Sequence, residues 1–226
     1  MPWIIREWAG TMGTVRLKDP FCSLSHAIGS LLAIAGLVLL IVWSKGDPWR
    51  VTSFAIYGAT LILLFAASAL YHGLKVSKRA EKALYGWDRT GIFLLIAGTY
   101  TPICLVGLGG GWGWSLFGVI WGLAIVGIAL DWATRQKMPH WAQAAFYLAM
   151  GWVFLIGIKP LLAALTPTMI GWLALGVVLY SSGAAICVRH PEAHPEKKLH
   201  FHDLWHAMVL GASACHFIVM ALLAKG

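Results

Sequence analysis

The sequence predicts an all-α polytopic membrane protein, a bundle of seven transmembrane helices with its N-terminus in the cytoplasm. Two observations predict this fold class. Hydrophobic residues make up 59% of the 226 residues and the mean hydropathy is +0.75, whereas apolar residues make up about half of an ordinary soluble domain. Charged residues contribute only 12%, too few to give several amphipathic helices a polar face. We therefore expect most of the chain to lie in lipid.

Seven apolar runs along the chain reach the length of about 20 residues that a helix needs to cross a bilayer. In order, they cover residues 22–43, 51–72, 85–108, 112–130, 141–158, 167–188 and 201–223. The tight link Gly109-Gly110-Gly111 separates the third run from the fourth. We predict that Lys159-Pro160 closes the fifth helix, because Pro cannot continue the helical hydrogen bonding and Lys favours the interface. The connections are mostly short, so we expect residues 1–226 to form a single domain.

Lys and Arg residues outside the predicted spans are divided unevenly between the two sides of the membrane. On the N-terminal side lie Arg6, Arg16, Lys18, Lys75, Lys78, Arg79, Lys82, Arg135, Lys137, Arg189, Lys197 and Lys198, against Lys45, Arg50, Lys159 and Lys225 on the other. Basic loops stay cytoplasmic, which places the N-terminus inside and, with an odd number of spans, the C-terminus outside. The basic residues behind the net charge of +8 thus indicate how the chain is oriented in the cell membrane, and we expect no nucleic-acid partner.

Ionisable residues at the ends of the predicted spans are the candidates for function, because such groups are costly in a membrane. His72 ends the second span, Asp88 lies near the start of the third, and His202 and His206 open the seventh. Successive spans alternate in direction, so all four residues reach the same cytoplasmic depth. The i, i+4 histidines share one helix face, about 6 Å apart, and His72 can add a third nitrogen. Three histidines with an open fourth position are typical of catalytic Zn²⁺, whereas structural sites have four protein ligands.

Each candidate also has a purely structural interpretation. Interfacial histidines can hydrogen-bond to headgroups or loops, and Asp88, in the first turn of a helix, interacts favourably with the helix dipole. Ser68, one turn before His72, can bond to its own backbone or to a neighbouring helix. The agreement in depth across three helices favours the metal site. His216 lies about 15 Å beyond His206 along the helix, so we expect it to serve packing or a hydrogen bond.

The remaining cysteines and histidines are expected to have structural or solvated roles. The cysteines occur singly, without a CxxC motif, and we interpret them as small hydrophobic residues with no disulfide framework. They are Cys22, Cys104, Cys187 and Cys215. We expect His26 and His140 at the membrane interface, and the histidines at positions 190, 194 and 200 in a solvated loop.

Three passages follow one another in a fixed order along the chain. They are Ser68-xxx-His72, then Trp87-Asp88-Arg89-Thr90-Gly91-Ile92-Phe93 continuing to Gly98-Thr99-Tyr100-Thr101-Pro102, and finally His202-xxx-His206 with His216-Phe217. With this ordered set the chain resembles the haemolysin III family, bacterial members of the progestin and adipoQ receptor superfamily, over nearly all seven spans. The resemblance implies that His72, His202 and His206 bind Zn²⁺. It also implies that Asp88 holds the metal-bound water and that Ser68 has a supporting role.

The leading hypothesis is a zinc-dependent hydrolase that cleaves a lipid amide or ester entering from the cytoplasmic leaflet. Zinc can lower the pKa of bound water from 15.7 to about 7 and polarise a carbonyl group. Asp88 would orient that water and accept its proton, and Ser68 would donate a hydrogen bond to the developing oxyanion. The zinc arrangement is similar to that of alkaline ceramidases, which supports the reaction type by analogy only.

Two other functions remain open. In the first, the protein is a membrane receptor or regulator, and a structural zinc ion ties the second and seventh spans together. In the second, it is a pore-forming, cytolysin-like protein. Pores have polar residues through the full depth of the bilayer, whereas the ionisable groups here concentrate on one side, so we rank the pore last. A membrane lipid is the expected substrate or ligand of the protein.

Overall fold

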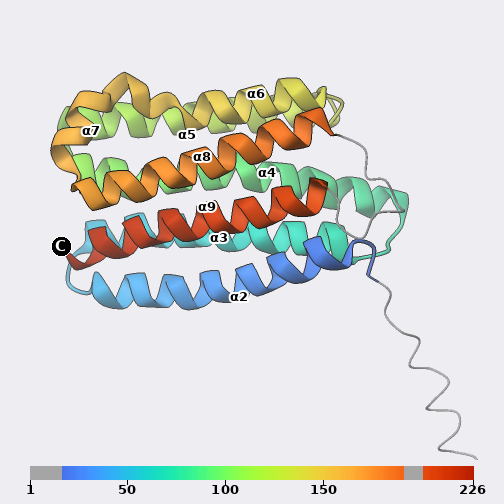
Figure 1. The fold of residues 1–226 in the computed structure, drawn as a ribbon, viewed down its shortest axis with the longest axis horizontal. Helices are drawn as coiled ribbons and strands as arrows, with labels where there is room; N and C mark the ends of the chain where they lie inside the picture. Colours follow the sequence, from blue (N-terminus) through green and yellow to red (C-terminus); the bar gives the residue numbers. More distant parts are fainter. Residues whose placement is uncertain (1–16, 191–200) are drawn as a thin grey trace, which may run out of the picture.

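The computed structural model describes residues 17–190 and 201–226, and every element in these ranges is a helix (Figure 1). Seven helical segments among them are long and apolar enough to cross a membrane. They are α2 (Pro20–Trp43), α3 (Pro48–Gly73), α4 (Lys78–Pro102) with η1 (Ile103–Leu108), α5 (Gly110–Ala133), α6 (His140–Gly151) with η2 (Val153–Gly157) and α7 (Ile158–Ala164), α8 (Pro167–Arg189), and α9 (Phe201–Lys225). The predicted all-α fold with seven spans is confirmed, and the cytoplasmic N-terminus stays a prediction. Arg6, Arg16, His194, Lys197, Lys198 and His200 lie outside the described residues.

Helices that are distant in the sequence become neighbours where the bundle closes. α3 packs against both α2 and α4, and α9 packs against both α8 and α2. Figure 1 shows that the first turns of α2, α4 and α9 and the last turn of α3 lie at the same end of the bundle. The C-terminus lies at the opposite end, as seven crossings require. This arrangement brings the predicted functional residues to one end of the bundle, as the alternating directions of the spans predict.

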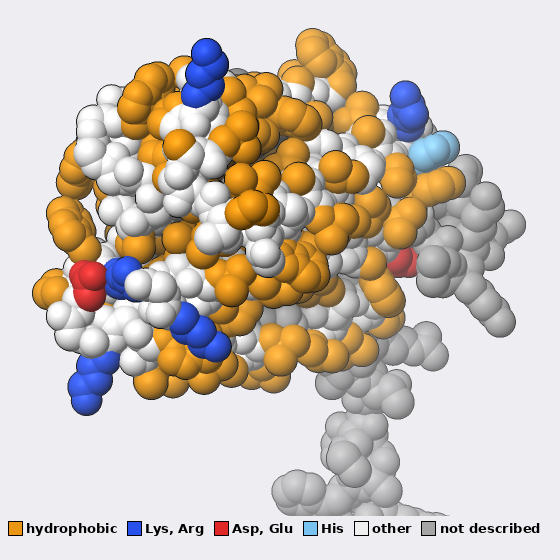
Figure 2. Space-filling model, turned by 60° about the vertical axis from the view of Figure 1, so that its left-hand side comes forward, with side chains coloured by type: hydrophobic (Ala, Val, Ile, Leu, Met, Phe, Trp, Pro, Cys, Tyr) orange, Lys and Arg blue, Asp and Glu red, His pale blue; other side chains and the backbone are white. Residues whose placement is uncertain are grey.

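Large hydrophobic side chains cover the outside of the bundle. Leu31 and Leu32 on α2, Ile125 on α5 and Ile156 in η2 are all more than 60% exposed, which water would penalise by about 25 cal/mol for each Å² of apolar surface. Figure 2 shows the same pattern, with hydrophobic atoms over the flank and the Lys and Arg side chains in view near the ends. The molecule is therefore a multi-pass membrane protein whose flanks face lipid.

The fifth span differs from its prediction at its end. α6 ends at Gly151, the 3₁₀ segment η2 follows, and α7 continues from Ile158 to Ala164. Pro160 lies in the first turn of α7, where its missing N–H is harmless because the first N–H groups of a helix have no intrahelical acceptor. The prediction that Lys159-Pro160 closes this helix is therefore wrong. The regular helix is interrupted earlier, at η2.

Candidate metal centre

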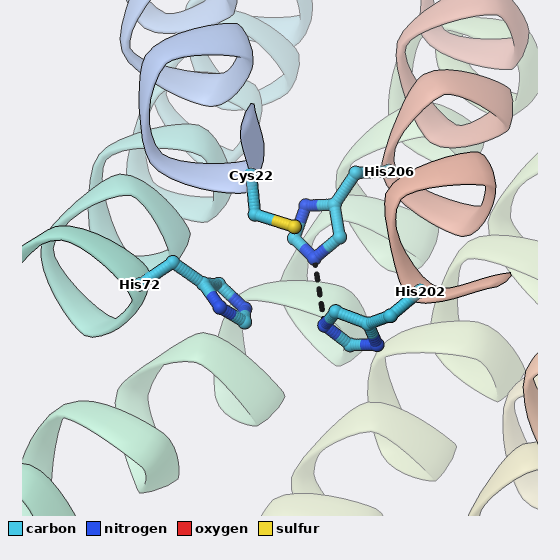
Figure 3. A group of neighbouring side chains, drawn as sticks. All are labelled: Cys22, His72, His202 and His206. Carbon is cyan, nitrogen blue, oxygen red and sulfur yellow. Dashed lines mark hydrogen bonds between the residues drawn. The ribbon is translucent and has the colours of Figure 1, made fainter. Parts of the chain in front are cut away.

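Four side chains from three helices converge at the end of the bundle. Cys22 comes from α2, His72 from α3, and His202 and His206 from α9 (Figure 3). One potential ligand atom of each lies within 4.8 Å of those of the other three. Cys22, His72 and His206 are buried and His202 is half-buried. Thiol and imidazole groups are the donors that Zn²⁺ and similar transition metals accept, so the donor chemistry fits such an ion.

The two histidines of α9 point their ring nitrogens at each other, as their i, i+4 spacing allows. The Nε2 atoms of His202 and His206 are 3.1 Å apart. Two nitrogen ligands at about 2.0–2.1 Å from one tetrahedral zinc ion are roughly 3.4 Å apart. The observed separation is close to that value, so little movement is needed for both rings to hold one ion.

His72 is oriented by a carboxylate from the residue before α2. Its Nδ1 lies 2.9 Å from Oδ2 of Asp19. Because a carboxylate only accepts, Nδ1 carries the hydrogen, and the lone pair of the neutral ring is then on Nε2. Asp19 occupies the N-cap position of α2 but makes no side-chain capping bond there, although Asp is a favoured capping residue. A carboxylate behind a ligating histidine is the usual outer partner in metal sites.

His206 has a histidine behind it. Its Nδ1 lies 3.0 Å from Nε2 of His26, which is 3% exposed. This contact occupies Nδ1 and leaves Nε2 directed at His202. His26 is buried against α9, where it supports a ring of the cluster, and its depth at the membrane interface stays a prediction.

Asp88 and Ser68 lie beside the cluster and not among its four converging atoms. The Asp88 carboxylate interacts with the His72 imidazole and with the Ser68 hydroxyl. Ser68 is 1% exposed and precedes His72 by one turn of α3. The structure thus brings all five predicted residues to one place, with the three histidines nearest to one another. Their roles as ligands or catalytic groups stay predictions.

A buried ion pair fixes the rotation of α4 next to Asp88. Arg89 donates to Asp131 of α5 and, at 2.8 Å, to the hydroxyl of Tyr85, and both partners of the ion pair are less than 5% exposed. Consecutive residues point about 100° apart around an α-helix. With Arg89 held against α5, Asp88 is turned toward α3 and His72.

The chain just before α2 is also tied to α4. Lys18 donates to Oε1 of Glu81 at 2.8 Å and lies 4.1 Å from the centre of the Tyr71 ring. Burial alone lowers the pKa of Lys18, but the bond to Glu81 and nearby negative charge raise it above its ordinary value. The ammonium group therefore stays charged and holds this segment against the ends of α3 and α4.

Acidic side chains surround the converging donors. Asp19, Asp88 and Asp203 all interact electrostatically with Cys22. Neutral imidazoles bring no charge of their own to balance a divalent cation, and burying an uncompensated charge is costly. The nearby carboxylates of Asp19 and Asp203 can provide that balance. The donor set, the nitrogen spacing and the charge together fit a divalent metal ion.

Sequence reasoning missed three members of this site: Cys22, His26 and Asp19. The apolar run around Cys22 predicts a packing residue, whereas the structure places Cys22 among the possible ligands. The i, i+4 spacing of Cys22 and His26 in the first span was a usable signal, since both fall at the depth of His72. His216 stays apart from the cluster, with its ring 5.5 Å from that of Tyr180.

Comparison with known proteins gives consistent matches over most of the chain. A family model described as "Haemolysin-III related" matches residues 15–217, which include all the residues of the cluster. The chain is 37% identical over 198 residues to a protein named "Hemolysin-3 homolog" from Bacillus subtilis (strain 168), covering 86% of this chain and 89% of that protein. It is also 38% identical over 198 residues to "Hemolysin-3" from Bacillus cereus, covering 86% of each.

Proposed function

The chain belongs to the haemolysin III family, and we propose that it is a zinc-dependent membrane hydrolase acting on a lipid amide or ester. In this proposal His72, His202 and His206 hold the zinc ion, and Asp88 and Ser68 serve the reaction. One observation carries the proposal. A carboxylate and a hydroxyl lie beside three converging imidazoles, and the group sits at the end of a lipid-facing bundle.

The chemistry divides between the ion and the chain. When bound, zinc supplies Lewis acidity, which makes water acidic enough to react near neutral pH and polarises a carbonyl. Asp88 lies next to His72 and can accept a proton from a water molecule beside it, as a general base does. Ser68 contacts Asp88 and so keeps the carboxylate directed toward the histidines. Asp19 and His26 hold two of the rings in place from behind.

The position of the site supports a lipid as the substrate. Exposed hydrophobic side chains flank the cluster at the same end of the bundle, among them Phe21 and Leu24 on α2 and Phe201 and Leu204 on α9. The polar linkages of membrane lipids lie in the interfacial layer at the edge of the hydrocarbon core. A group at the end of a span lies near that depth.

A second function is favoured by one specific observation, the presence of Cys22 among the converging atoms. Four protein donors are typical of structural zinc, whereas catalytic zinc keeps one position open. In this alternative the metal joins α2, α3 and α9 and stabilises a receptor or regulator. It predicts that removing zinc lowers the unfolding temperature while no lipid is hydrolysed.

Hydrolysis in detergent micelles tests the proposal. Wild type and Asp88→Asn would be incubated with labelled ceramide and phosphatidylcholine, with Asp47→Asn at the far end of α3 as the control. We expect turnover in wild type and in the control. Asp88→Asn should retain its metal but lose activity, because an amide cannot accept the proton. Full activity in Asp88→Asn would refute the proposed mechanism.

A further inference from the structure

We propose that Cys22 is a fourth ligand of the metal centre, and that its thiolate closes the coordination position that hydrolysis needs open. The first turn of α2 thus acts as a built-in block of the site. This inference rests on the proposed metal centre and adds its regulation. The protein would then have two states, a closed one with four protein ligands and an open one with three.

The geometry places the Cys22 sulfur among the histidine nitrogens. Its Sγ is one of the four atoms that lie within 4.8 Å of one another, and the residue is 1% exposed. Figure 3 shows its sulfur directed toward the imidazole of His206, with the rings of His72 and His202 in the same group. A buried thiol that only packed would lie among apolar side chains, whereas this one lies near three imidazole nitrogens and donates to the Asp203 carboxylate.

Hydrogen bonds hold the first turn of α2 in this position. The backbone N–H of Asp19 donates to the carbonyl of His72 at 2.8 Å, and the hydroxyl of Ser23 donates to the carbonyl of Ala69 at 3.0 Å. A methyl group added at Gly73 would come within 2.5 Å of the Ser23 hydroxyl, so the two helices approach closely there. The hydrogen bonds on either side of Cys22 therefore fix its position along the bundle axis relative to His72.

Asp203 provides the acceptor that binding of the thiol requires. The thiol of Cys22 donates to Oδ1 of Asp203 at 3.2 Å, and the thiolate is the form that binds metals. If the thiol bound the ion, its S–H proton would leave by way of Asp203, and the sulfur would replace one water molecule. No oxidant or reductant takes part.

Closing the site changes what it can do. Three protein ligands leave room for water or substrate, but four fill a tetrahedral ion. Asp88 approaches from α4, outside the four converging atoms, so a Cys22-bound ion would leave it no water to activate. Moving the first turn of α2 away from α3 and α9 would open the position. Substitution of Cys22 by Ala removes the block and should raise any lipid turnover above the wild-type rate.

Electronic absorption of the cobalt-loaded protein tests the ligand directly and without an activity assay. Thiolate bound to Co²⁺ gives a charge-transfer band in the near ultraviolet, and tetrahedral Co²⁺ gives visible bands whichever donors surround it. We expect both in wild type, and we expect Cys22→Ser to lose the near-ultraviolet band while keeping the visible ones. The control Cys187→Ser, which changes a half-buried cysteine on α8, should keep both.

The possible outcomes distinguish a failure of the Cys22 ligand from a failure of the metal centre. Visible bands without the near-ultraviolet band in wild type, or an unchanged near-ultraviolet band in Cys22→Ser, would overturn the role of Cys22 alone. Folded wild type that binds no cobalt would overturn the metal centre as well. X-ray absorption of the zinc-loaded wild type needs no variant: we expect one sulfur at about 2.3 Å, and a shell of nitrogen and oxygen only would refute the inference.

Discussion

The Nε2 atoms of His202 and His206 face each other at 3.1 Å. Two lone pairs cannot lie this close without a hydrogen or a cation between them. On His206 the other ring nitrogen is already in contact with His26, and the Nδ1 of the neighbouring His72 is bound to Asp19. The nitrogens that face inward are therefore the ones left to bind an ion, and the outward ones are held by the protein.

Removal of the metal should lower the unfolding temperature. An ion that binds only the folded state stabilises it by RT ln(1 + [L]/Kd), about 2.7 kcal/mol when the free ion is at 100 times its Kd. Thermal unfolding in detergent, before and after treatment with a chelator, measures the change, and added Zn²⁺ should restore it. His206→Ala should unfold at the same temperature with and without chelator. An unaltered wild-type curve would mean that no ion joins the three helices.

Asp19→Asn should weaken metal binding without unfolding the protein. The carboxylate holds the Nδ1 hydrogen of His72, and loss of such an outer partner typically costs 10–100-fold in metal affinity. Competition with a chromophoric zinc chelator measures the affinity. Asp47→Asn is the matched control, since it removes a carboxylate that contacts Arg50 at the other end of α3. Equal affinities in the two variants would contradict the role of Asp19.

Arg89→Met should destabilise the bundle strongly. Arg89 and Asp131 form an ion pair with both side chains less than 5% exposed, and removal of one partner of a buried pair costs about 3–5 kcal/mol. The double variant Arg89→Met with Asp131→Leu should recover most of the loss, because no uncompensated charge remains. Unfolding temperatures of the single and double variants measure both effects. A double variant no better than the single one would show that the pair acts through its geometry and not its charge.

Gly91→Ala should loosen the contact that places Asp88 near His72. A Cβ at Gly91 would lie 2.9 Å from the Cα of Leu64 on α3, and backbone cannot move aside as a side-chain tip can. Overpacking of this kind costs about 1–3 kcal/mol, so we expect a lower unfolding temperature and weaker activity. Gly118→Ala on α5, where nothing lies within 4 Å, should be neutral or slightly stabilising. An equal drop in unfolding temperature in both variants would contradict the steric explanation.

The sequence was most informative where one physical rule governed a whole segment. Apolar length alone predicts seven spans, and the alternation of their directions brings His72, Asp88 and His202 to one end. Cys22 and His26 were missed because each is ordinary in an apolar helix, and only the packing of α2 against α9 shows what they touch. The partnership of Arg89 with Asp131 and the break at η2 also depend on contacts between helices, which hydropathy does not describe.

The zinc content of freshly purified protein tests the central claim most directly. Elemental mass spectrometry would be applied to detergent-purified wild type, to His202→Ala, and to His216→Ala as a control for a histidine that lies deeper in α9. We predict about one zinc ion per chain in wild type and in the control, and a large loss in His202→Ala, since one of its three nitrogen ligands is gone. Folded wild type without zinc, or equal zinc in His202→Ala, would contradict the account.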